Sequence, residues 1–145
     1  QLKELAEKVD FFSVGSNDLT QYVLAVDRNN AQVSALYDSY HPAVLRVLNF
    51  IAQEAKNYHV PLSICGELAG EPGGALLLVA MGYDKLSMNS HNITKVKWAI
   101  RHVSYDTTKI ILSHCLSLSS TQLVHDYLNE QLESLGFGGF VRAGM

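Results

Sequence analysis

The sequence has little of what several classes of protein require. Its two cysteines, Cys65 and Cys115, lie too far apart for a disulfide framework or a cysteine-based metal site. Its longest apolar runs, such as residues 75–81, fall far short of the roughly 20 residues of a membrane-spanning helix. Lysines and arginines are scattered in a chain of net charge −3, so there is no basic stripe for nucleic acid. The first ten residues do not resemble a secretory signal. We therefore expect a cytoplasmic protein without membrane or nucleic-acid partners.

The sequence has only 3 prolines, and its 10 glycines in 145 residues are an ordinary number, while 48% of the residues are hydrophobic. This composition excludes disorder and collagen-like repeats, and the length suits one domain with a buried core. Leu2, Leu5, Ala6 and Val9 follow helical spacing from the start, and no capping residue precedes them. The pattern suggests a piece of a longer protein.

Strand-like and helix-like segments alternate along the first hundred residues. Short apolar runs at 11–14, 62–65 and 85–88 predict strands, and each is followed by a polar segment. Helical patterns are predicted at 19–26, 42–55, 73–81, 93–103 and, with a break at 117–120, 106–135. Such a series predicts an α/β fold with parallel strands.

Three parallel strands alone would leave their edges and one face exposed. We therefore expect these units to be the last portion of a larger α/β barrel or sheet. Chemistry in either fold sits at the carboxyl ends of the strands, which here are residues 15–18, 65–67 and 87–89.

Four residues at or after these strand ends have more than one functional interpretation. Asn17 and Asp18 either cap a helix or bind a ligand, with Asp18 suited to Mg²⁺. Arg28 either pairs with Asp27 at the surface or binds a phosphate or carboxylate. Cys65 is either a small buried hydrophobe or a thiol that donates a proton or attacks a substrate.

The remaining chemical groups give weaker signals. The glycine-rich segment 66–74 precedes a helix but matches neither a Walker loop nor a Rossmann fingerprint. None of the six histidines pairs with another at zinc-ligand spacing, and we expect them on helices or at the surface. Cys115 is predicted to lie in the core.

Three motifs together resemble a known family. Residues 15–22 (GSNDLTQY), 24–28 (LAVDR) and 64–70 (ICGELAG) are similar, in order and spacing, to the phosphoenolpyruvate (PEP)-utilising enzymes. Within them they most resemble enzyme I of the bacterial phosphotransferase system, a PEP–protein phosphotransferase. The resemblance covers about residues 9–103. Details such as residues 10–14 (DFFSV), Met88-Asn89 and residues 95–98 (KVKW) are most similar to the nitrogen-branch enzymes.

The resemblance implies a (β/α)₈ TIM-type barrel, of which this chain would supply strands six to eight. Residues 1–105 would belong to the barrel, 106–136 would form C-terminal helices packed on it, and 137–145 would be a flexible tail. By motif, Asp18 would be a Mg²⁺ ligand, Asn17 and Asp18 would line the PEP site, Arg28 would hold the phosphate, and Cys65 would be the proton donor.

The resemblance also implies partners and missing parts. The family moves the phosphoryl group of PEP to a histidine on a separate N-terminal domain, and then to a histidine phosphocarrier protein. No residue here matches that histidine, so the chain alone is expected to be inactive, and a homodimer is expected. The alternatives are a pyruvate-phosphate dikinase or PEP synthase barrel, and a non-catalytic dimerisation module.

Overall fold

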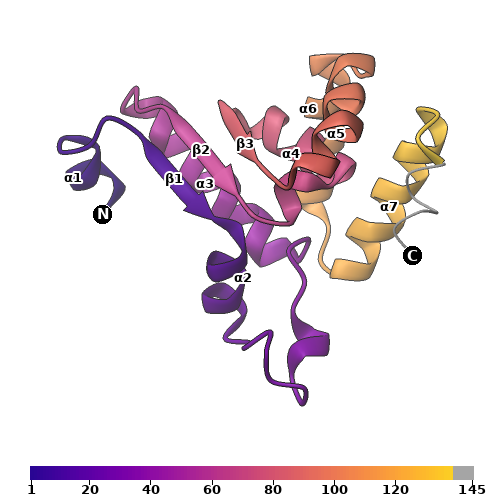
Figure 1. Ribbon diagram of the computed structural model, residues 1–145, viewed down its shortest axis with the longest axis horizontal. Coiled ribbons are helices and arrows are strands. Elements are labelled where there is room, and N and C mark those ends of the chain that lie inside the picture. The colour runs from indigo at the N-terminus through magenta and orange to yellow at the C-terminus, as the bar shows by residue number, and fades with distance from the viewer. Residues whose placement is uncertain (139–145) are drawn as a thin grey trace.

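The fold is built on three short parallel strands, in a computed structural model that describes residues 1–138. These are β1 (Phe12–Gly15), β2 (Leu62–Cys65) and β3 (Lys85–Ser87), in the order β1-β2-β3. Figure 1 shows the strands side by side and pointing the same way, with their carboxyl ends toward the middle of the molecule. The predicted parallel arrangement is confirmed.

The two faces of the sheet differ in chemistry. The register aligns Val14, Ile64 and Leu86 across the three strands, and their side chains belong to or pack against the main hydrophobic core. Because side chains alternate along a strand, the residues between them face the opposite way. That second face carries Ser63 and Lys85 in one row and Cys65 and Ser87 in the next, at the carboxyl end.

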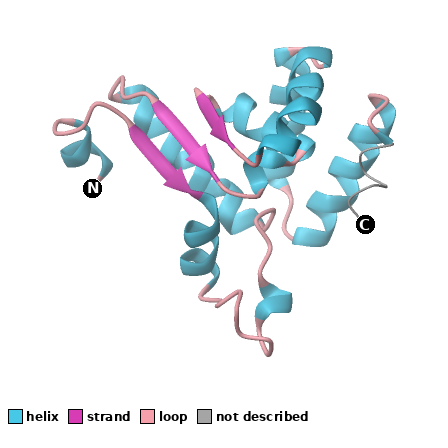
Figure 2. Cartoon of the chain, in the orientation of Figure 1, coloured by secondary structure: helices cyan, strands magenta, loops and turns pink. Residues whose placement is uncertain are grey.

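Helices cover the apolar face of the sheet and fill most of the remaining chain (Figure 2). The two that build the main core are α3 (Pro42–Asn57) and α4 (Pro72–Met81). Each has proline in its first turn, where the missing N–H is not needed. The side chain of His41 accepts a hydrogen bond from the Ala43 N–H and so caps α3. Gly82, in the left-handed region, ends α4 as predicted.

The other helices surround this core. They are α1 (Leu2–Ala6), α2 (Ser16–Leu24), α5 (Ser90–His102), α6 (Tyr105–Ser117) and α7 (Thr121–Ser134), with short 3₁₀ turns η1 (Ser34–Leu36) and η2 (Leu68–Gly70). Ser104 and Ser120 cap α6 and α7 through their side-chain oxygens. None of these helices, within residues 1–138, is long and apolar enough to cross a membrane.

Two helices begin three residues earlier than the sequence predicts. The polar segment after β1 was expected to be a turn, but α2 starts at Ser16, directly after the strand. Likewise α5 starts at Ser90 rather than Ile93. Serine and asparagine favour the first turn of a helix as well as the turn before it, so polarity alone does not locate the boundary.

The C-terminal end of the described chain packs on the body. Phe137, which was assigned to the flexible tail, is only 1% exposed and lies in a second apolar cluster with Leu76, Ala99 and Leu132. Its ring meets that of Trp98 edge-on at 4.8 Å. Burial of an aromatic side chain outweighs the flexibility of the glycines around it. Residues 139–145 of the predicted tail lie outside the described residues.

Candidate functional site at the carboxyl ends of the strands

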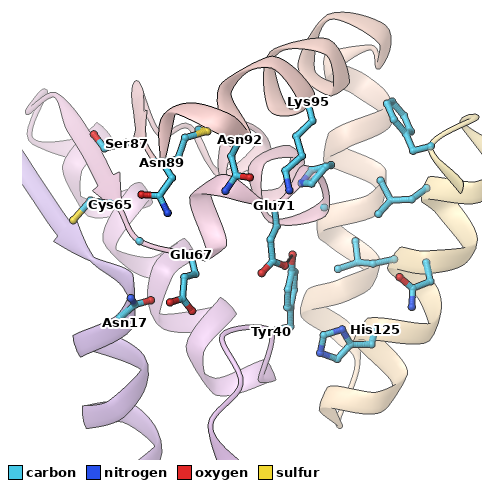
Figure 3. Close-up of a pocket in the computed structure, with 18 residues that line it drawn as sticks. Asn17, Tyr40, Cys65, Glu67, Glu71, Ser87, Asn89, Asn92, Lys95 and His125 are labelled. Carbon is cyan, nitrogen blue, oxygen red and sulfur yellow. Dashed lines mark hydrogen bonds between the residues drawn. The ribbon is translucent and has the colours of Figure 1, made fainter. Parts of the chain in front are cut away.

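A pocket opens at the carboxyl ends of the three strands. Its volume is about 970 Å³, and it extends from the strand ends to α5 and α7. Figure 3 shows the polar side chains that line it, from three strand ends on one side to His125 of α7 on the other. These are Asn17, Tyr40, Cys65, Glu67, Glu71, Ser87, Asn89, Asn92, Lys95 and His125.

Cys65 is the last residue of β2 and lies in the pocket wall. Its thiol is exposed, so the interpretation of Cys65 as a small buried hydrophobe is wrong. The sheet register sets it between Gly15 of β1 and Ser87 of β3. Cys115, in contrast, is buried in the core as predicted, and burial raises the pKa of its thiol to about 12. The pocket therefore holds one accessible thiol.

The first turn of α2 is held tightly against the end of β2. The Ser16 hydroxyl donates to the Cys65 carbonyl at 3.0 Å. Gly66 follows with φ of +129°, and a Cβ there would lie only 2.1 Å from Ser16 Oγ and 3.2 Å from Asn17 Oδ1. Only glycine permits this approach. The contact brings Asn17 and Cys65, which are 48 positions apart, to one pocket.

Asn17 and Asp18 occupy different surroundings although they are neighbours. Asn17 lines the pocket, and its Oδ1 accepts a hydrogen bond from the Tyr37 hydroxyl at 3.3 Å. Asp18 is exposed in the first turn of α2 and does not line the pocket. Neither residue caps the helix, because Gly15 holds the N-cap position, so the capping interpretation is wrong.

Arg28 lies outside the pocket, in the exposed loop that connects α2 to α3. Its backbone N–H donates to Gln21 Oε1 at 2.9 Å. The interpretation that pairs its side chain with Asp27 is wrong, because no ion pair joins these two residues; one oxygen of the Asp27 carboxylate accepts from the Asn29 N–H. The one ion pair among residues 1–138 joins His125 and Asp38.

A second polar cluster occupies the other end of the pocket. His125 Nε2 of α7 lies 2.7 Å from Asp38 Oδ2, and the Tyr40 hydroxyl donates to Glu71 Oε2 at 2.8 Å. The rings of Tyr40 and His125 meet edge-on at 4.9 Å, so the two pairs are adjacent. Figure 3 shows Lys95 extending from α5 toward Glu71 in the same cavity. The cluster ties α7 to the segment that precedes α3.

The pKa values in this cluster follow from its hydrogen bonds. The bond to Asp38 raises the pKa of His125, more than burial lowers it, and the charge of Glu71 adds to the rise. Burial raises the pKa of Asp38, but its bonds to His125 and the Tyr40 N–H outweigh this effect, so its pKa is lowered overall. Burial first and the Glu71 carboxylate second raise the pKa of Tyr40. At neutral pH the phenol remains a hydrogen-bond donor.

Comparison with known proteins identifies the family. A sequence profile of the PEP-utilising enzyme, PEP-binding domain, matches residues 1–105. The chain belongs to this family. The expected resemblance to PEP-utilising enzymes is therefore confirmed.

Several relatives are similar in sequence to this PEP-binding domain chain over most of its length. It is 43% identical over 144 residues to a "Phosphoenolpyruvate-dependent phosphotransferase system" protein of Salmonella typhimurium, covering 99% of this chain and 19% of that protein. It is 39% identical over 127 residues to a "Phosphoenolpyruvate-protein phosphotransferase" of Borreliella burgdorferi, covering 88% and 22%. A "Multiphosphoryl transfer protein" of Xanthomonas campestris is 40% identical over 124 residues, covering 86% and 15%. The chain thus spans about a fifth of the length of its relatives.

Asp18 supplies the one carboxylate that was predicted from this chain for a Mg²⁺ site. No group of three or more histidine, cysteine or acidic side chains that could hold a metal ion occurs among residues 1–138. Mg²⁺ commonly takes one or two protein carboxylates and completes its shell with phosphate oxygens and water. Exposed Asp18, at the carboxyl end of β1, fits one such position, and further ligands would have to come from elsewhere.

Sequence reasoning missed the cluster around Tyr40 and His125. His125 lies on a helix, α7, as expected of the histidines, but its position at the pocket and its pairing with Asp38, 87 positions earlier, were not predicted. No local spacing could reveal this pairing. Tyr37 was missed for the same reason, because the loop from α2 returns it to Asn17 over 20 positions.

Proposed function

We propose that this chain is the C-terminal part of a PEP–protein phosphotransferase, the enzyme I type of the bacterial phosphotransferase system. Membership of the PEP-binding family and the printed names of the relatives support this assignment. The observation that carries it is the meeting of Asn17 and Cys65, one from each of two family motifs, in one pocket. Enzyme sites in parallel α/β folds lie at this end of the sheet.

The same proposal makes β1, β2 and β3 strands six to eight of a (β/α)₈ barrel. Three strands with two open edges and an uncovered polar face suit a segment of a closed barrel better than a complete sheet. Residues 1–105 would form the barrel segment, and 106–136, which include α6 and α7, would pack outside it. Earlier strands would close the barrel and complete the site.

The reaction would transfer the phosphoryl group from the enol oxygen of PEP to a histidine nitrogen on an N-terminal domain. The P–O bond breaks, a P–N bond forms, and the enolate of pyruvate remains. The Cys65 thiol then donates its proton to the terminal carbon of the enolate, which gives pyruvate and a thiolate. Water returns a proton to the thiolate before the next turnover. The exposed position of Cys65 in the pocket supports this role.

The other residues would bind and orient PEP. Phosphoryl transfer depends on positioning and charge neutralisation more than on covalent help from the protein. Asn17 would donate an amide N–H to the substrate anion from the pocket wall. Arg28 would hold the phosphate, a role that rests on the motif because the residue lies outside the pocket. Asp18 would hold Mg²⁺, which neutralises phosphate charge when bound, and this role and its place beside PEP also rest on the motif, because Asp18 does not line the pocket.

The proposed enzyme acts in the cytoplasm as a homodimer and passes its phosphoryl group to a histidine phosphocarrier protein. The 43% identity to the Salmonella typhimurium protein over almost the whole chain supports placing it with the phosphotransferase systems rather than the dikinases. Residues 10–14 and 95–98 favour the nitrogen branch within them. The 145 residues alone lack the acceptor histidine, so by themselves they would not catalyse transfer.

The test compares the full-length enzyme with its Cys65→Ala variant. With Mg²⁺, the wild type is expected to become phosphorylated from [³²P]PEP and to pass the label to a phosphocarrier protein. Loss of the general acid is expected to slow pyruvate formation about a hundredfold or more. Ser63→Ala is a matched control, because Ser63 lies two positions earlier on β2 and its hydroxyl contacts the Phe12 carbonyl.

Three results would change the proposal. Absence of phosphorylation of the wild type by PEP would contradict the phosphotransferase assignment and favour a non-catalytic module. Phosphate passing to a nucleotide rather than to a protein would favour a dikinase. Unchanged pyruvate formation in Cys65→Ala would keep the enzyme and remove Cys65 from its chemistry.

A further inference from the structure

We propose that Tyr37 is a positioning residue for PEP binding, which acts by holding the side-chain amide of Asn17 in one orientation. This inference rests on the proposed function, because it takes Asn17 as a ligand of the substrate. Tyr37 lies directly after η1, in the loop between α2 and α3, and is half-buried. Its hydroxyl is 3.3 Å from Asn17 Oδ1 and donates to it.

The two ends of the Asn17 amide interact differently with an anion. Its oxygen only accepts hydrogen bonds, and its nitrogen only donates them. PEP carries phosphate and carboxylate groups, so it needs the N–H and is repelled by the oxygen. An amide free to rotate would present either end to the substrate. An orientation fixed in advance therefore increases affinity.

The hydrogen bond from Tyr37 engages the oxygen end of Asn17. Gly66 leaves room for that oxygen, because a Cβ at this position would lie 3.2 Å from Asn17 Oδ1. The Nδ2 group donates to no protein atom among residues 1–138, so it remains available to a ligand in the pocket that Asn17 lines. Figure 3 shows Asn17 and Cys65 on the same side of that pocket.

The backbone that follows Tyr37 is anchored at three successive residues. Asp38 pairs with His125, and Tyr40 donates to Glu71. Between them, Ser39 accepts a weak hydrogen bond from the Thr20 hydroxyl at 3.4 Å. These contacts reach α7, the residue that precedes α4, and α2, so the Tyr37 hydroxyl is presented from a fixed position. A donor held in this way orients its partner at little entropic cost.

The first test measures PEP kinetics in the full-length enzyme and its Tyr37→Phe variant. Exchange of labelled pyruvate into PEP needs no carrier protein and reports the transfer step in both directions. Loss of one neutral hydrogen bond is expected to raise KM for PEP about three- to tenfold, with kcat within about twofold. Tyr58→Phe, the same change at the far end of α3, is expected to match the wild type.

The second test asks whether Tyr37 acts through Asn17. Kd for PEP with Mg²⁺ is measured by calorimetry in full-length protein whose acceptor histidine is replaced by alanine, so that PEP binds without transfer. Tyr37→Phe is expected to weaken binding about three- to tenfold when Asn17 is present, and by less than about twofold in the Asn17→Ala background.

The outcomes separate this inference from the proposed function. Equal Kd values for Tyr37→Phe and wild type would overturn the inference and leave the phosphotransferase assignment intact. Equal losses with and without Asn17 would also overturn it, because Tyr37 would then act elsewhere. Failure of the wild type to exchange pyruvate with PEP would overturn the proposed function and the inference together.

Discussion

At the scale of single residues, the two cysteines have opposite environments. Cys65 is exposed at the end of a strand, whereas Cys115 is fully buried and burial raises the pKa of its thiol to about 12. Thiolates, not thiols, react with maleimides and disulfides, and they must be reachable. The two thiols should therefore differ greatly in reactivity.

We expect a maleimide at neutral pH to modify Cys65 in the folded protein and to leave Cys115 unmodified until denaturant is added. Mass spectrometry of the labelled peptides measures both sites in one sample. Cys65→Ser serves as the control, since it should remove native labelling altogether. Equal labelling of the two cysteines before denaturation would contradict the burial of Cys115.

Gly66 is the second residue on which the site depends. It combines φ of +129° with a Cβ direction that points at Ser16 Oγ, 2.1 Å away. Gly82 also has positive φ, +104°, but a Cβ there would meet nothing within 4 Å. Substitutions at the two glycines therefore distinguish the free-energy cost of backbone strain from the cost of a steric clash.

Gly82→Ala is expected to lower the free energy of unfolding by about 1–2 kcal/mol, through strain alone. Gly66→Ala should cost more and also separate the first turn of α2 from Cys65, where Ser16 donates to the carbonyl. Urea unfolding of both variants measures the difference. Equal losses of unfolding free energy in the two variants would mean that α2 shifts away from residue 66 at no cost in stability.

At the scale of elements, α7 is held on the pocket by a titratable pair. Its His125 lies 2.7 Å from Asp38, and the pair is only partly buried. The raised pKa of His125 means that its contribution to stability is complete below the ordinary histidine value of about 6.5 and is lost as pH rises through the raised value. The lowered pKa of Asp38 means that its contribution is present above about 3.9 and is lost as pH falls through the lowered value.

Asp38→Asn is therefore expected to destabilise the protein most at about pH 5.5, by about 1 kcal/mol or less because solvent screens the pair. The difference in Tm from wild type should be smaller at about pH 8.5, because the His125 contribution is lost as pH rises through its raised pKa. Thermal melts at both pH values measure it. Glu130→Gln is the control, because Glu130 is an exposed acid on α7, the helix that carries His125. A loss that does not depend on pH would show that the pair makes no charge-dependent contribution.

At the scale of the whole molecule, the three-stranded sheet formed within residues 1–138 has two open edges. In that part of the chain β1 and β3 each pair with β2 only, so their outer edges carry unpaired backbone groups. Phe11 lies just before β1 and is 62% exposed. Exposed edges of this kind recruit other strands. The isolated chain has a physical reason to associate with itself.

We expect the isolated 145-residue chain to sediment as a dimer or larger species. Phe11→Lys, which puts a charge beside the β1 edge, should shift it toward the monomer. Phe50→Lys is a matched control, because Phe50 is similarly exposed, at 56%, but lies on α3. Analytical ultracentrifugation of the three proteins measures this. A well-folded monomer of the unsubstituted chain would contradict the inference.

The sequence by itself determined the elements of this protein and their order. Alternating apolar runs and helical periodicity predicted three strands and their helices, because these patterns are local, and β2 was predicted residue for residue. The motifs predicted the family for the same reason, since each is a short run of chain. The boundaries were less exact. The strand predicted at 11–14 is Phe12–Gly15, and two helices start three residues early, where serine and asparagine suit adjacent positions equally well.

The tertiary structure alone decided which side chains meet. Tyr37 reaches Asn17, and His125 reaches Asp38, across 20 and 87 positions of chain. In the folded chain Cys65 is exposed, Arg28 lies outside the pocket, and Phe137 is buried. Such outcomes depend on how loops return and how helices pack against the sheet, and neither leaves a periodic signal in the sequence.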